Sequence, residues 1–168
     1  MTKTTLTAAI AITLIMPTLA TCSKDPVATK SFEAMSSAAA AVDYWISQGR
    51  VMAAALASNQ AEFTDLLRRS SVLPADQPGE AYSAAFNASN GVMAITIRGM
   101  TTESCRALVE NVKPAKPAKV HGAYPLSVFD SCSRKNQFAT GTPPGVTVTF
   151  CIPSAVVACP GPGGVVRM

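Results

Sequence analysis

Apolar residues recur at intervals of three and four positions from Ser31 onward, with small and polar residues between them. This period places them on one face of an α-helix that runs from Ser31 to about Ala57. The stripe consists of Phe32, Met35, Ala39, Val42, Ile46, Ala53 and Leu56. Gly49 interrupts the stripe, and we expect a kink there. Tyr44 and Trp45 lie beside the stripe and are expected in the core or at its edge.

A second, shorter helix is indicated immediately afterwards. Asn59 can cap its N-terminus, and Glu62, three residues later, completes a pairing similar to a capping box. The apolar side of this helix consists of Phe63, Leu66 and Leu67. We expect it to end near Ser70, with Arg68 and Arg69 in the last turn, where positive charge favours the helix dipole.

The second half of the chain has the two-residue alternation of β-strands. The sequence from Pro74 to Gly91 contains further proline and glycine and is expected to form a loop. From Val92 to Arg98, apolar side chains alternate with smaller or more polar ones, so that one face of this strand should contact the long helix. The apolar members are Met93, Ile95 and Ile97. Gly99 should end the strand.

A third helix is predicted after Gly99. Thr101 is a suitable N-cap and Glu103 lies in the first turn, where an acidic side chain is favoured. The inner face of the helix is formed by Cys105, Leu108, Val109 and Val112. This spacing places the Cys105 thiol on the buried side, where a second cysteine could reach it.

Two further strand regions complete the pattern. Residues 120–129 form one short strand or two, broken at Pro125. A clear half-buried strand follows the Gly-Thr-Pro-Pro-Gly turn, because Val146, Val148 and Phe150 alternate with threonines. The segment 160–168 is rich in glycine and proline and is expected to be a loose tail.

Composition limits the classes of protein to consider. The chain has 168 residues, of which 48% are hydrophobic and 14% charged, which suits one domain with a real core. The net charge of +4 comes from scattered residues. The local basic cluster of Lys113, Lys116 and Lys119 lies among prolines and alanines rather than aromatic residues, so we expect no nucleic-acid partner.

The N-terminus has the pattern of an export signal. Lys3 precedes an uncharged apolar run from Leu6 to Ala20, which is short for a membrane-spanning helix. Residues 1–21 are therefore predicted to be a signal peptide, followed by a linker at residues 22–30. Leu19-Ala20-Thr21-Cys22 also approaches the lipobox of bacterial lipoproteins, which makes Cys22 a candidate for lipidation.

The cysteines fit an oxidising compartment. Five cysteines leave one thiol over in an exported chain, and lipidation of Cys22 would account for it. The other four, Cys105, Cys132, Cys151 and Cys159, permit three pairings. None has the spacing of a metal site, because there is no Cys-x-x-Cys motif and His121 is the single histidine.

Candidate chemistry is otherwise sparse. His121 lies next to a glycine in an expected turn, without the spacing of a catalytic triad. The carboxylates, including Asp43, Asp65, Asp76 and Asp130, are dispersed along the chain. The Gly-Pro-Gly-Gly sequence near the end lacks the strand, helix and lysine of a phosphate-binding loop. We therefore expect no enzyme, no metal and no cofactor.

One combination of segments resembles a known family. The strand VMAITIR, the segment GMTTESCRALVENV, the segment VHGAYPLSVFDSC and the closing strand VTVTF together resemble the head domain of type IVb pilins, of the PilS type and more distantly of the toxin-coregulated type. The resemblance covers roughly residues 31–150. It implies an α+β fold in which a long N-terminal helix packs on a small antiparallel sheet, with a disulfide-bonded C-terminal region. It also implies a Cys105–Cys132 bridge, which leaves Cys151 to pair with Cys159.

The resemblance sets the functional expectation for a pilin-like domain at residues 31–159. It implies a minor or accessory subunit of a type IVb pilus in a Gram-negative bacterium, exported to the periplasm, outer membrane or pilus, with other pilins or assembly proteins as partners. The N-terminus departs from the family, because the first glycine is Gly49 and no acidic residue precedes Asp25. The alternative is a stand-alone periplasmic lipoprotein that binds a protein or ligand and is anchored through its lipid.

Overall fold

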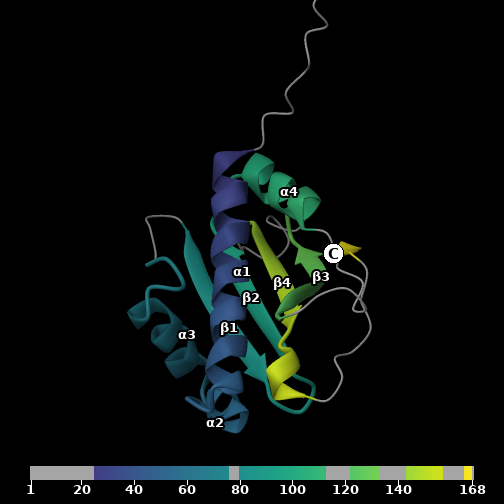
Figure 1. Ribbon diagram of the computed structural model, residues 1–168. Coiled ribbons are helices and arrows are strands. Elements are labelled where there is room, and N and C mark those ends of the chain that lie inside the picture. The colour runs from purple at the N-terminus through teal and green to yellow at the C-terminus, as the bar shows by residue number, and fades with distance from the viewer. Residues whose placement is uncertain (1–24, 76–79, 113–121, 133–142, 157–164, 168) are drawn as a thin grey trace, which may run out of the picture.

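The computed structural model describes residues 25–75, 80–112, 122–132, 143–156 and the backbone of 165–167. The fold is α+β, with helices on one side of a single sheet (Figure 1). The helices are α1 (Pro26–Ser47), α2 (Ala53–Ser58), α3 (Gln60–Arg69), α4 (Thr102–Asn111) and the short 3₁₀ helix η2 (Pro153–Ala155). The strands are β1 (Ala81–Asn87), β2 (Val92–Arg98), β3 (Tyr124–Asp130), β4 (Gly145–Cys151) and β5 (Val165–Arg167).

Helix α1 begins earlier than the apolar stripe predicted. Asp25 is its N-cap, and one carboxylate oxygen accepts hydrogen bonds from the N–H groups of Val27 (2.8 Å) and Ala28 (3.1 Å). Pro26 follows in the first turn, where its missing N–H has no cost. Residues 26–30 therefore belong to the helix, and the predicted start at Ser31 and the predicted linker over these residues are wrong.

Gly49 ends α1 instead of kinking it. With φ of +64° it adopts the left-handed conformation that favours glycine after a helix. Its N–H donates to the Ile46 carbonyl, and the next N–H, of Arg50, donates to the Trp45 carbonyl, as in a Schellman motif. The chain therefore forms two helices, α1 and the short α2, where a single helix to Ala57 was predicted. Helix α2 turns away from the axis of α1 at the lower end of the molecule (Figure 1).

The sheet contains strands that the sequence pattern did not predict. The order is β1-β2-β4-β3-β5, and the first four strands are antiparallel while β5 runs parallel to β3. Strand β1 lies within the predicted loop from Pro74 to Gly91, and β5 lies within the predicted loose tail. The chain order is not the spatial order, because β4 pairs with β2 on one side and with the earlier β3 on the other.

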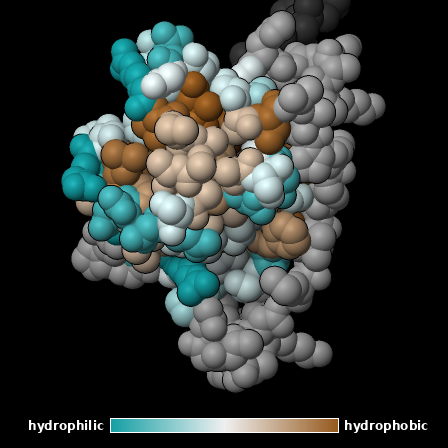
Figure 2. Space-filling model, turned by 90° about the horizontal axis from the view of Figure 1, so that it is seen from below, coloured by the Kyte–Doolittle hydropathy of each residue, from teal (hydrophilic) through white to brown (hydrophobic). Residues whose placement is uncertain are grey.

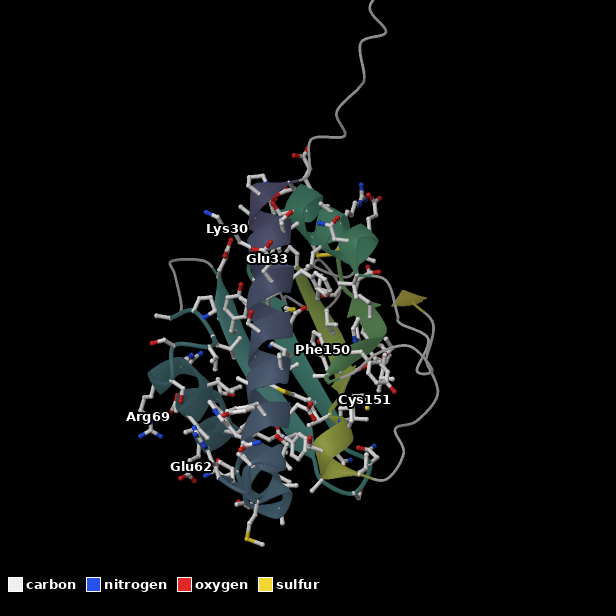
Figure 3. All side chains as sticks on the ribbon, viewed as in Figure 1. Lys30, Glu33, Glu62, Arg69, Phe150 and Cys151 are labelled. Carbon is white, nitrogen blue, oxygen red and sulfur yellow. A yellow bond between two sulfur atoms is a disulfide. The ribbon has the colours of Figure 1, made fainter. Side chains whose placement is uncertain are left out.

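The core lies between α1 and the sheet (Figure 1). The apolar members of the two predicted strands are buried on this side, as expected: Met93, Ile95, Ile97, Val146, Val148 and Phe150. Helix α1 buries Met35, Ala38, Ala39 and Val42 against them. In Figure 3 Phe150 lies beside α1 at the middle of the sheet. The aromatic pair on α1 divides, since Trp45 packs against the core whereas Tyr44 is 51% exposed.

The other predicted elements are confirmed with small changes. Asn59 caps α3 by accepting from the N–H groups of Ala61 and Glu62, and Thr101 caps α4 by accepting from the N–H of Ser104. Strand β3 continues past Pro125, where its pairing with β4 shifts by one residue instead of breaking. Among the described residues, no helix is both long enough and apolar enough to cross a membrane. The Leu6–Ala20 run lies outside them.

Candidate functional site

A disulfide fixes α4 to the sheet. Cys105, on the buried face of α4, is bonded to Cys132, which follows β3, with 5.6 Å between the two Cα atoms. The bridge implied by the pilin resemblance is therefore present. It closes a loop with a sequence separation of 27 residues, and loop-closure entropy gives such a bond about 3.5 kcal/mol of stabilisation.

Cys151 is also disulfide-bonded. It is the last residue of β4, fully buried, and it packs in a small second cluster with Tyr124 and Leu126. Its predicted partner Cys159 lies outside the described residues, as do the lipidation candidate Cys22 and the single histidine, His121.

The N-terminus of α1 is joined to α4 through one carboxylate. The second Asp25 oxygen accepts a hydrogen bond from the Ser104 hydroxyl (2.8 Å), and Ser104 in turn accepts one from the hydroxyl of Thr101 (3.0 Å). The Ser104 hydrogen bond, with the N-cap bonds, holds the pKa of Asp25 below its ordinary value. This link fixes the position at which the segment before residue 25 enters the fold.

Three of the described aspartates have separate structural partners. Asp43 accepts from the N–H of Ser154 on η2 (2.9 Å), and Asp130 accepts from the N–H of Cys132 (3.4 Å). Asp65 pairs with Arg68 one turn away on α3 (3.4 Å). In the part of the chain that the structure describes, no group of three or more His, Cys, Asp or Glu side chains could hold a metal ion.

Helix α3 covers the outer edge of β1, a contact that the sequence did not indicate. The N–H of Ala84 donates to the hydroxyl of Thr64 (2.9 Å), which lies 3.1 Å from the carbonyl of the same residue. Two residues before Ala84, the Tyr82 carbonyl accepts from the Arg68 guanidinium (2.7 Å). Side chains of α3 thus take the place of a further strand, and they block an edge that could otherwise pair with another chain.

Burial of the Tyr82 side chain has an electrostatic effect. Desolvation raises the pKa of its phenol, while a hydrogen bond with Ser31 of α1 opposes the rise. Both side chains are buried, so this polar contact links α1 to β1 inside the core.

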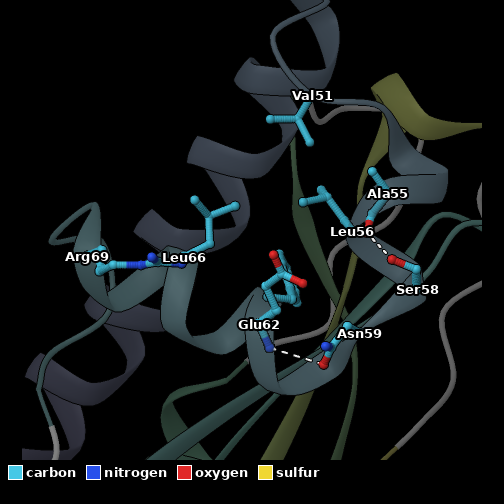
Figure 4. A pocket seen from close by; sticks show the side chains of 9 residues that line it. Val51, Ala55, Leu56, Ser58, Asn59, Glu62, Leu66 and Arg69 are labelled. Atoms are coloured by element: carbon cyan, nitrogen blue, oxygen red, sulfur yellow. Dashed lines mark hydrogen bonds between the residues drawn. The ribbon is translucent and has the colours of Figure 1, made fainter.

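A groove with a partly apolar lining lies between α2 and α3 (Figure 4). It has a volume of about 300 Å³ and is lined by Val51, Ala55, Leu56, Ser58, Asn59, Glu62, Phe63, Leu66 and Arg69. Leu56 and Phe63 are buried beneath it, whereas Glu62 and Arg69 are exposed on α3. We refer to the nine lining residues together with Met52 as the α2–α3 face.

Exposed apolar surface adjoins this groove. Met52, the N-cap of α2, is 75% exposed, and Ala54 and Ala55 in the first turns of α2 are exposed as well. Viewed from the end at which α2 lies, apolar side chains gather at the centre of the surface and hydrophilic ones surround them (Figure 2). Exposed apolar surface that is surrounded by polar groups is typical of interaction sites.

Hydrophobic periodicity does not reveal the α2–α3 face, because this face depends on where α1 ends. Ala53 and Leu56 continue the periodicity of the α1 stripe, so periodicity alone places them in the long helix. Once Gly49 ends that helix, the residues after it turn against α3, and Met52 is left outside. The sequence signal that indicates this face is Gly49, because a glycine after a helical stretch is a common C-terminal cap.

Comparison of this chain with protein-family models, with characterised proteins and with solved structures finds no match in any of the three.

Proposed function

We propose that this chain is an exported, non-enzymatic pilin-like subunit of a type IVb pilus, with a minor or accessory role in adhesion, mating-pair contact or assembly. The observation that carries the proposal is the Cys105–Cys132 bridge between α4 and the end of β3, at the two positions implied by the resemblance. A helix packed on an antiparallel sheet, the arrangement that the resemblance also implies, supports it.

We expect this protein at a limited number of positions in the pilus and not along its shaft. If residues 1–21 are removed as a signal peptide, the chain loses its longest N-terminal apolar run. The helix that remains, α1, buries its apolar stripe against its own sheet and exposes residues such as Lys30 and Glu33, seen on its upper half in Figure 3. Such a helix has no second apolar face with which to join a shaft.

The test combines a deletion in the host with analysis of sheared filaments. We expect the deletion to lower pilus number, adhesion or mating, and the wild-type gene to restore it. The double variant Cys105→Ser/Cys132→Ser should restore less, because it lacks the bridge. Unchanged filaments and unchanged contact functions after deletion would refute the pilus role. If the protein were as abundant as the major subunit in sheared pili, the minor role would be refuted.

The second candidate is a stand-alone periplasmic lipoprotein, favoured by the approach of Leu19-Ala20-Thr21-Cys22 to a lipobox. Mass spectrometry of the mature N-terminus separates the candidates. A diacylglyceryl-modified Cys22, together with no effect of deletion on pili, would support the lipoprotein. An unmodified N-terminus at or near residue 22 would exclude it.

A further inference from the structure

The charged residues of the α2–α3 face have an arrangement that is complementary to itself. Glu62 and Arg69 are exposed, and both line the groove from α3. They are seven positions apart, which is about two helical turns and about 10 Å along the axis, so they lie on the same side of α3 with Glu62 toward its N-terminus. Figure 3 and Figure 4 place them at different ends of the helix.

A twofold axis through the middle of this side would bring opposite charges together. If a second α3 packs antiparallel to the first, Glu62 of each copy faces Arg69 of the other, and both ends of the interface are matched. In a twofold dimer every contact occurs twice, because the same patch is used by both subunits. A parallel arrangement would instead oppose like charges.

The apolar part of the face also suits a second copy. Leu66 lies between the two charged residues on α3 and is partly exposed beside the groove. Met52 follows the lining residue Val51 in the chain and is 75% exposed, and an unbranched methionine adapts to irregular apolar pockets. The exposed Met52 side chain and the groove of about 300 Å³ give each copy both a projection and a recess.

We propose that the chain forms a twofold dimer through the α2–α3 face, in which Met52 of each copy enters the groove of the other and two Glu62–Arg69 pairs fix the antiparallel orientation. This interface does not depend on the proposed pilus role. A dimer of the isolated protein supports it whether or not the chain enters filaments.

The experiment measures the mass of the purified protein by sedimentation equilibrium from about 1 to 100 µM, the range in which a modest interface is populated. The wild type should show a concentration-dependent dimer. Glu62→Arg creates two Arg–Arg contacts and Arg69→Glu creates two Glu–Glu contacts, so each single variant should raise the dissociation constant at least about tenfold. The double variant Glu62→Arg/Arg69→Glu exchanges the charges and should dimerise nearly as well as the wild type.

Matched controls separate the interface from changes in folding or net charge. Glu103→Arg reverses an exposed glutamate that lies, like Glu62, in the first turn of its helix, but on α4 and away from the face. Arg106→Glu is the control for Arg69→Glu, because it reverses an arginine on α4. Both controls should dimerise like the wild type. Met52→Ser should weaken dimerisation without lowering the melting temperature, since this side chain is mostly exposed in one copy.

Two outcomes would overturn the proposal. A wild type that is monomeric over the whole concentration range would leave the α2–α3 face to a partner of different sequence. A dimer that both single charge reversals leave unchanged, or that the double variant fails to restore while its melting temperature stays normal, would place the interface elsewhere.

Discussion

Replacement of Thr64 by valine tests whether α3 acts as a substitute for a strand at the edge of the sheet. Valine has nearly the same shape as threonine but has no hydroxyl. The Ala84 N–H would lose its acceptor at 2.9 Å and its carbonyl a donor at 3.1 Å, while both stay beneath α3, where Thr64 is buried. The perturbation therefore removes hydrogen bonds without opening a cavity.

The expected loss of stability arises because the N–H and carbonyl groups of Ala84 stay buried without their partner. A buried donor without a partner costs about 1–3 kcal/mol. Part of this is offset, because the hydroxyl no longer has to be desolvated and the Thr64 contact with the Gln60 carbonyl within α3 adds little to a helix. We expect a net loss of about 2 kcal/mol in the free energy of unfolding.

Urea unfolding under oxidising conditions measures the effect, followed by circular dichroism and by the fluorescence of Trp45, the single tryptophan. With a slope of about 2 kcal/mol per M, the midpoint should fall by about 1 M. The control is Thr96→Val, because the Thr96 hydroxyl bonds to that of Thr147 on a half-buried face of the sheet and not to a backbone group. That variant should change the free energy by less than about 0.5 kcal/mol.

The reasoning would be refuted if the two valine variants had the same stability. It would also be refuted if Thr64→Ser, which keeps the hydroxyl and loses a methyl group, were as unstable as Thr64→Val. Either result would mean that packing of α3, and not its hydrogen bonds to β1, stabilises this edge.

Three further changes have expected outcomes. Cys105→Ser should lower the free energy of unfolding by about 3.5 kcal/mol. Reductant should lower the melting temperature of the wild type, whereas the variant has already lost the Cys105–Cys132 bond and should show no further loss from that bond. Because the pKa of Asp25 is lowered in the fold, its contribution to stability is complete above its ordinary pKa of 3.8 and is lost as pH falls through the folded pKa; Asp25→Asn should flatten that part of an acid-unfolding curve. Gly91→Ala should lower the free energy of unfolding by about 3 kcal/mol and Gly49→Ala by about 1 kcal/mol, as measured in thermal melts. Both glycines have positive φ, but only at Gly91 would a Cβ meet the Val156 side chain, at 2.5 Å. Equal losses in the two variants would contradict this prediction.

Local signals in the sequence were sufficient for the helices with clear caps. Asn59 and Thr101 act through contacts within three residues, so the starts of α3 and α4 followed from the sequence. Asp25 followed by Pro26 is an equally clear start signal for α1, but the first turn buries little beyond Ala28, so the apolar stripe pointed to a later residue.

Elements that depend on distant partners were not predictable. Strand β1 contains three alanines, which have weak strand propensity, and its alternation is supported by β2 on one side and by Thr64 and Arg68 on the other. The Cys105–Cys132 pairing came from the family resemblance, since spacing alone left three pairings open. The α2–α3 face required the direction of the chain after Gly49, which periodicity cannot give.

The central position of β4 has a consequence for how the chain can fold during synthesis. Ile95 of β2 pairs with Val148 of β4, so the long second edge of the β1–β2 hairpin has no partner until nearly the whole chain has emerged. Contacts this far apart in sequence slow folding, and an unpaired apolar edge is prone to aggregation. A chain cut short before residue 145 would keep α1 and the hairpin but have no strand to fill the middle of the sheet. Shortened versions of this protein should therefore collect as insoluble or degraded material instead of as a smaller folded domain.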